Sequence, residues 1–129
     1  MAKNVLLITT DQQRYDSLGC TGGTIAKTPV IDGLAQNGII YHQARNQCPV
    51  CMPARSTILT GQYIRMHGVT SNGIPLPADH PSLAHELKAV GYSTALIGKA
   101  HFEPHAAKTF FENIAAGENT YGPHRGFDH

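Results

Sequence analysis

The sequence is poor in charge, and neither sign is in excess. Charged residues make up 15% of its 129 positions, against roughly 25% in an average globular domain. Ten Lys and Arg against nine Asp and Glu leave a formal net charge of +1. A protein that binds nucleic acid through the phosphates needs a basic excess. We therefore expect no nucleic-acid partner.

Cysteine and long apolar runs are also scarce. Cys20, Cys48 and Cys51 are too few for a disulfide scaffold, so we interpret them as reduced thiols. The apolar run at residues 5–8 is too short for the core of a signal peptide or for a membrane span. We expect no membrane partner and a cytoplasmic location, or a periplasmic or secreted one if the N-terminus was trimmed.

The sequence does contain enough apolar residues for a core. The hydrophobic share is 41%, which argues against disorder, and the length fits one domain or a piece of a larger one. In chain order, the patterns predict strand 5–8, helix 29–38, strand 39–41, helix 53–61, helix 82–90 and strand 92–97. This alternation predicts an α/β fold with a largely parallel sheet flanked by helices.

Local signals mark the ends of the predicted helices. Thr28 and Ser82 are typical N-cap residues. Gly38, Gly61 and Gly91 are typical of positions just past a helix end. The helix boundaries therefore follow from residues close to them in the sequence.

The cysteines Cys48 and Cys51 have the spacing of a C-x-x-C motif, which allows two interpretations. A redox pair before a helix would form a disulfide and show reductase activity, but the preceding residues 44–47 are polar and do not form the expected buried strand. Half of a zinc site needs a second ligand pair at a suitable spacing, and the sequence has no second C-x-x-C motif.

The longer string around Cys51 gives a third interpretation. Cys51-x-Pro53-x-Arg55, followed by Leu59-Thr60-Gly61, resembles the signature of the sulfatase family, within the alkaline phosphatase superfamily. It matches every fixed position of that signature. The resemblance implies an alkaline-phosphatase-like fold, and it implies that Cys51 is oxidised after translation to the aldehyde formylglycine.

Other segments resemble the same family in the same order. Residues 4–14 resemble its opening strand, residues 28–35 its T-P-N-[I/L]-D-x-L-A helix, and residues 91–101 its G-Y-x-T-x-x-x-G-K-x-H segment. A further short match falls at residues 126–128. We expect residues 1–129 to be the N-terminal part of a sulfatase catalytic domain whose remainder is absent from this chain.

The resemblance implies roles for several residues. The hydrated aldehyde at Cys51 offers one hydroxyl to attack sulfur and a second to expel sulfate, an exit that a plain Ser or Cys does not have. Arg55 would steady the nucleophile, and Lys99 and His101 would bind the sulfate oxygens and manage protons. Asn72 is a candidate substrate contact, although an Asn-Gly turn explains it at least as well.

The resemblance also implies a divalent metal. Asp11 and Gln12 match two ligand positions of the family, and the modified Cys51 would be a third ligand. Both side chains offer oxygen, which suits a hard cation, and we expect Ca²⁺ in preference to Mg²⁺. The family usually has a second Asp where Gln12 stands, and Gln is familiar from the branch that includes phosphonate monoester hydrolases. That branch tends to lack Lys99 and His101, whose presence favours sulfate esters.

The family's enzymes are several times longer than this chain, and their second pair of metal ligands comes from the later half. We therefore expect a sulfuric ester hydrolase whose first 129 residues are inactive alone. The partners would be a small-molecule sulfate ester and the enzyme that makes formylglycine. The alternatives are a phosphonate monoester or phosphodiester hydrolase on the same scaffold, and an inactive fragment that acts as a binding module. The sequence gives no oligomeric state.

Overall fold

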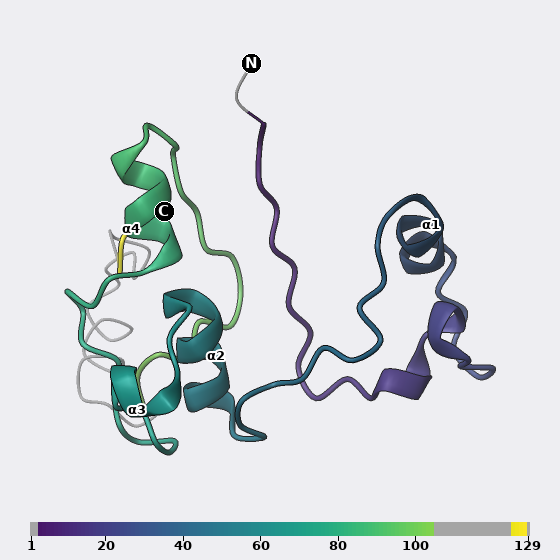
Figure 1. The fold of residues 1–129 in the computed structure, drawn as a ribbon, viewed down its shortest axis with the longest axis horizontal. Helices are drawn as coiled ribbons and strands as arrows, with labels where there is room; N and C mark the ends of the chain where they lie inside the picture. Colours follow the sequence, from purple (N-terminus) through teal and green to yellow (C-terminus); the bar gives the residue numbers. More distant parts are fainter. Residues whose placement is uncertain (1–2, 105–124, 129) are drawn as a thin grey trace, which may run out of the picture. The chain divides into compact units, whose positions relative to one another are not determined.

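The computed structural model describes residues 3–104 and 125–128. The chain divides into two compact units, Met1–Ala44 and Arg45–His129. The first, purple to blue in Figure 1, holds the 3-10 helices η1 (Tyr15–Ser17) and η2 (Gly19–Thr21) and helix α1 (Pro29–Asn37). The second, teal to yellow, holds α2 (Cys51–Thr60), α3 (Ile64–His67) and α4 (Leu83–Ala89). None of the helices in the described residues has the length and apolar character needed to cross a membrane.

Two helices begin and end where their capping residues predicted. Helix α1 starts at Pro29 and is followed by Gly38. Helix α4 follows Ser82, whose hydroxyl accepts a hydrogen bond from the N–H of His85 at 3.3 Å. Gly91, with a φ of 89°, comes just after the end of α4. These boundaries confirm that short-range signals set both helices.

The Thr28 side chain makes no N-cap hydrogen bond to the helix backbone, and side-chain contacts with η2 stabilise the start of α1 instead. The hydroxyl of Thr28 accepts the N–H of Gly19 at 2.9 Å and donates to Asp32 Oδ1 at 3.0 Å. The same carboxylate oxygen accepts the N–H of Cys20 at 2.7 Å. A Cβ on Gly19 would lie 2.5 Å from Asp32 Oδ2, so a larger residue at this position would displace the Asp32 carboxylate. The contacts tie η2 to the first turn of α1.

The core of the second unit is small and is built around α2. Its buried members are Met52, Leu59, Val69, Leu76 and Phe102. Helix α2 supplies Met52 and Leu59, which are seven positions apart and therefore lie on one helix face. Three partly buried residues pack against this cluster: Leu96, Ala100 and Phe127. The core fixes which face of α2 is covered.

The predicted strands are unconfirmed in the described residues. Residues 5–8, 39–41 and 92–97 carry no strand assignment within residues 3–104 and 125–128. The apolar side chains at 5–8 are exposed, with Leu6 at 84% and Ile8 at 71%. A parallel strand is held by hydrogen bonds to neighbouring strands and is covered by helices on both faces. Thr94 makes one backbone contact, since its carbonyl accepts the N–H of Asp128 at 2.9 Å, but residues 92–97 carry no strand assignment. The sheet is therefore unconfirmed in the described residues.

His67 is a buried histidine at the end of α3. Its Nδ1 accepts the N–H of Val69 at 3.1 Å, and its Nε2 lies 3.0 Å from the hydroxyl of Thr57. Because Nδ1 accepts, the proton of the neutral ring is on Nε2 and is donated to Thr57. Burial lowers the pKa of His67, and the charge of His80 lowers it further. The ring is therefore held neutral as it links α3 to α2.

We expect this histidine to make stability fall in mild acid. The pKa of His67 is lower in the folded state than the value of about 6.5 in an unfolded chain. The unfolded state therefore binds the proton first. The stabilisation is fully present above about pH 6.5 and is lost as the pH falls through the folded-state pKa, by at most about 1.4 kcal/mol per pH unit.

Urea unfolding of the purified protein at several pH values between about 7.5 and 5 would measure this slope. His67→Gln removes the titrating group, so the pH dependence of its unfolding free energy should be shallower in this window. An equal slope in the variant and the wild type would contradict the assignment.

Candidate functional site

The candidate nucleophile stands at the first residue of α2. The helix begins at Cys51, two residues before the expected start at Pro53. Val50 occupies the N-cap position in an extended conformation and offers no side-chain cap. The thiol of Cys51 is free and half-buried. Backbone N–H groups in the first turn of a helix point beyond its N-terminus, so this position favours an anion.

Asn72 supplies the cap that Val50 lacks. Its Oδ1 accepts the N–H of Met52 at 3.0 Å, across twenty positions of sequence. The N–H of Gly73 in turn donates to the sulfur of Met52 at 3.2 Å. Asn72 also lies in a turn, in which the N–H of Ile74 reaches the carbonyl of Ser71 at 3.4 Å. The Asn-Gly turn is therefore confirmed, while contact with a substrate remains a prediction.

Because Asn72 caps α2, we expect Asn72→Ala to lower the free energy of unfolding by about 1 kcal/mol. Asn72→Asp keeps an acceptor oxygen and adds negative charge near a helix N-terminus, so it should remain close to wild type. Chemical denaturation measures both variants. Ser71→Ala, at the exposed neighbouring position, is the matched control. An Asn72→Ala variant as stable as this control would show that the cap contributes nothing.

Arg55 connects the first turns of α2 to the segment that carries two other candidates. Its Nη1 donates to the backbone carbonyl of Lys99 at 2.6 Å. The chain turns sharply here, with a φ of 96° at Gly98 and 53° at His101. A left-handed conformation at a residue other than glycine costs about 1–3 kcal/mol and is typical of functional sites. The contact holds the Lys99–His101 turn against α2.

The structure therefore joins Cys51, Asn72, Arg55 and Lys99 through contacts with α2, all within the second unit. The roles predicted for their side chains in catalysis remain predictions. Two contacts could not be predicted from the sequence: the hydrogen bond from Met52 N–H to Asn72, and the one from Arg55 to the carbonyl of Lys99. No sequence motif signals either of them, because both join segments that are distant in the chain.

Two of the three predicted metal ligands, Asp11 and Gln12, lie in the first unit. Asp11 is exposed, and Gln12 has a left-handed φ of 52°. A carboxylate and an amide oxygen are chemically suited to a hard divalent cation such as Ca²⁺ or Mg²⁺. Among the residues that the structure describes, no cluster of three or more His, Cys, Asp or Glu side chains could hold a metal. Asp11 and Gln12 therefore stay a predicted part of a ligand set.

Cys48 is a free thiol beside the start of α2. Its sulfur accepts the N–H of Val50 at 3.4 Å, so it is directed along the chain toward Cys51. All three cysteines of the chain are free in this structure. The redox interpretation of the C-x-x-C motif stays a prediction. The zinc interpretation has no support in the described residues, where no suitable cluster occurs.

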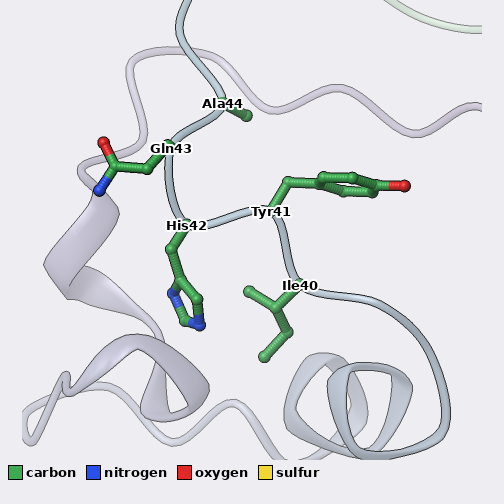
Figure 2. A pocket seen from close by; sticks show the side chains of 5 residues that line it. All are labelled: Ile40, Tyr41, His42, Gln43 and Ala44. Carbon is green, nitrogen blue, oxygen red and sulfur yellow. The ribbon is translucent and has the colours of Figure 1, made fainter.

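A pocket in the first unit lies away from these residues in the sequence. It is lined by five consecutive residues: Ile40, Tyr41, His42, Gln43 and Ala44. Figure 2 shows Tyr41 and Gln43 pointing to opposite sides of this segment. Nδ1 of His42 is 2.5 Å from the hydroxyl of Tyr15, which fixes the imidazole against η1. None of the predicted site residues lines this pocket, so the start of α2 remains the candidate site.

The chain is similar to known proteins over most of its described length. A family model described as Sulfatase matches residues 3–129. An ulvan-active sulfatase of Formosa agariphila is 37% identical over 107 residues, which are 83% of this chain and 21% of that protein. A multifunctional alkaline phosphatase superfamily protein of Trinickia caryophylli, PehA, is 40% identical over 101 residues, 74% of this chain and 20% of that protein.

A solved structure shows a similar arrangement. A Bacteroides fragilis protein described as a sulfatase, yidJ, matches with a TM-score of 0.68 and 35% identity, over 73% of this chain and 22% of the other. This chain thus spans about a fifth of the length of the proteins that it matches.

Proposed function

The chain belongs to the sulfatase family, and on that premise we propose that it carries the nucleophile of an enzyme that hydrolyses sulfate esters. The observation that supports this most is the position of Cys51 at the first residue of α2, with Asn72 and Arg55 ordered around the same helix. The proposed fold of the whole enzyme is the alkaline-phosphatase-like one, with a largely parallel sheet. The proposed partner in maturation is an enzyme that converts Cys51 to formylglycine.

Sulfate esters are poor electrophiles because negatively charged oxygens crowd the sulfur. As hydrated formylglycine, residue 51 would supply one hydroxyl for attack and a second for release of sulfate. The N-terminus of α2 would stabilise the negative charge that gathers there. Asn72 would hold the first turn of the helix in place through the N–H of Met52.

The Lys99–His101 turn would bind the substrate. Arg55 fixes the backbone of this turn through the carbonyl of Lys99. The ammonium of Lys99 is suited to a sulfate oxygen as a compact charge, and His101 can hold or pass a proton near neutral pH. Preorganisation of these groups against α2 would stabilise charge in the transition state more than in the ground state.

Asp11 and Gln12 would be ligands of a divalent cation, and Ca²⁺ is favoured over Mg²⁺. Bound near the sulfate, such a cation would neutralise its oxygens. Asp11→Ala removes the charged ligand, so the affinity of the purified protein for Ca²⁺ should fall at least about tenfold. Calorimetric titration measures this, with Asp16→Ala as the control, since Asp16 is occupied by Arg14. Unchanged affinity in Asp11→Ala would remove this residue from the metal site.

One alternative remains within the same scaffold, a phosphonate monoester or phosphodiester hydrolase. Gln12 in place of a second Asp supports it, as does the similarity to a multifunctional superfamily protein. Activity of the mature protein on a panel of sulfate, phosphonate and phosphodiester substrates separates the two. A preference for sulfate esters in kcat/KM supports the main proposal, and a preference for phosphorus esters replaces it.

Peptide mass spectrometry tests the proposal directly. Trypsin should release residues 46–55 from the protein as its own cell makes it, with Cys48 and Cys51 in one peptide. If Cys51 is converted, one oxygen replaces a sulfur and two hydrogens, and only Cys48 still reacts with iodoacetamide. Cys48 thus serves as an internal control for alkylation. Two alkylated thiols in every copy of the peptide would end the formylglycine proposal.

A further inference from the structure

We propose that Cys48 is a redox partner of Cys51, and that a disulfide between them withholds Cys51 from conversion to formylglycine. The two thiols are separated by Pro49 and Val50, and both are free and half-buried. The proposed disulfide depends only on these two thiols. The claim that it blocks conversion of Cys51 to formylglycine depends on the proposed function.

The contact of the Cys48 sulfur sets its direction. Sγ of Cys48 accepts the N–H of Val50, the residue immediately before Cys51, at 3.4 Å. The side chain is therefore folded forward over the short segment that leads into α2 rather than away from it. Val50 is extended, and Cys51 is already the first helical residue. The two cysteines are thus three positions apart at the start of the helix, and a ring closed by so few residues loses little chain entropy.

The third cysteine does not compete. Cys20 lies in the other unit, where its backbone N–H is bound by Asp32 at 2.7 Å. Burial raises the pKa of the Cys20 thiol, and the neighbouring carboxylate of Asp32 raises it further. A thiol with less thiolate is a slower attacking group in disulfide exchange. The pairing is thereby confined to the C-x-x-C motif.

The oxidant is a low-molecular-weight disulfide such as oxidised glutathione. The thiolate of one cysteine attacks it, breaks the sulfur–sulfur bond and releases one reduced glutathione. The thiolate of the second cysteine then attacks the mixed disulfide, forms the Cys48–Cys51 bond and releases a second reduced glutathione. The two protons lost by the protein thiols end on these two released thiols, so atoms and electrons balance. While the bond persists, the sulfur that maturation must remove is not present as a thiol.

The first experiment uses purified protein made without the modifying enzyme, so that Cys51 keeps its thiol. After equilibration with oxidised and reduced glutathione, the protein is alkylated and digested. We expect the peptide of residues 46–55 to lose two hydrogens and to resist alkylation, in the wild type and in Cys20→Ala alike. Cys48→Ser should carry glutathione on Cys51 instead. A wild-type peptide in which both cysteines remain alkylated or each carries glutathione would overturn the pairing.

The second experiment adds the modifying enzyme under oxidising and under reducing conditions. The ratio of reduced to oxidised glutathione is chosen so that the wild type still holds the Cys48–Cys51 disulfide while Cys51 of Cys48→Ser is largely a free thiol. At this ratio the aldehyde yield at Cys51 should collapse in the wild type and should be retained in Cys48→Ser. Equal losses in the two proteins would overturn the protective role, because the oxidant would then act on the modifying enzyme. If no condition yields the aldehyde, the proposed function fails, and the first experiment still decides whether the disulfide forms.

Discussion

Arg125→Ala should lower the free energy of unfolding by about 3–4 kcal/mol, because it strands a buried carbonyl and opens a cavity. The side chain of Arg125 is 1% exposed. Its Nη2 and Nε donate to the carbonyl of Leu76 at 2.5 and 3.2 Å. Its guanidinium also lies 5.7 Å from the ring centre of Phe102. Chemical denaturation of the purified variant measures the loss.

Two further variants separate the contribution of the hydrogen bonds to Leu76 from that of the ion pair with Glu103. Arg125→Met fills most of the space and loses the donors to Leu76, so it isolates the hydrogen-bond contribution at about 1–3 kcal/mol. Glu103→Gln removes only the charge of a partner that sits 3.1 Å from Arg125 and is 38% exposed, so it should cost less than about 1 kcal/mol. If Glu103→Gln proved as damaging as Arg125→Ala, the ion pair rather than the carbonyl would be the stabilising contact.

The helices that the sequence predicted are those whose signals are local. Pro29 and Gly38 bound α1, and Ser82 caps α4, as their positions in the sequence indicated. Helix α3 was not predicted, because its four residues are too few to show a helical period. Its end at Gly68, with a φ of 76°, is a local signal of the same kind.

The predicted start of α2, at Pro53, was wrong by two residues, and the reason is physical. Val50 has no capping side chain, so the sequence gives no reason to begin the helix at Cys51. The cap is Asn72, which reaches Met52 from twenty positions away. A contact between distant segments depends on the fold and leaves no periodic trace in the sequence. The motif identified Cys51, and the geometry of its helix came only from the structure.

In the candidate site, too, the sequence predicted which residues take part but not how they contact one another. The signature identified Arg55 and Lys99 as residues, but their link is a bond from a guanidinium to a backbone carbonyl, 44 positions apart. A carbonyl is present at every position, so no residue type marks it. The predicted strands failed to appear in the described residues for a related reason, since a strand exists only with its neighbours.

In the mature protein, Cys51→Ala should lower kcat/KM for an aryl sulfate by on the order of 10⁴-fold or more, because loss of a covalent nucleophile leaves only binding and electrostatic stabilisation. Stability should change little. Cys51 is the half-buried first residue of α2, and the helix cap comes from the backbone of Met52 and the side chain of Asn72. The same variant should give a normal unfolding curve, which separates a chemical effect from a folding effect.

Cys51→Ser is the sharper variant, because it restores one hydroxyl but not the second. A serine at the start of α2 can attack sulfur once, and the resulting sulfate ester has no neighbouring hydroxyl to expel it. We expect a single turnover followed by arrest, with the peptide of residues 46–55 heavier by one SO3 group, since the ester oxygen leaves with the alcohol. Cys48→Ala, assayed under reducing conditions, is the matched control and should turn over normally. Sustained turnover by Cys51→Ser would mean that an ordinary hydroxyl is enough, and the need for formylglycine at this position would disappear.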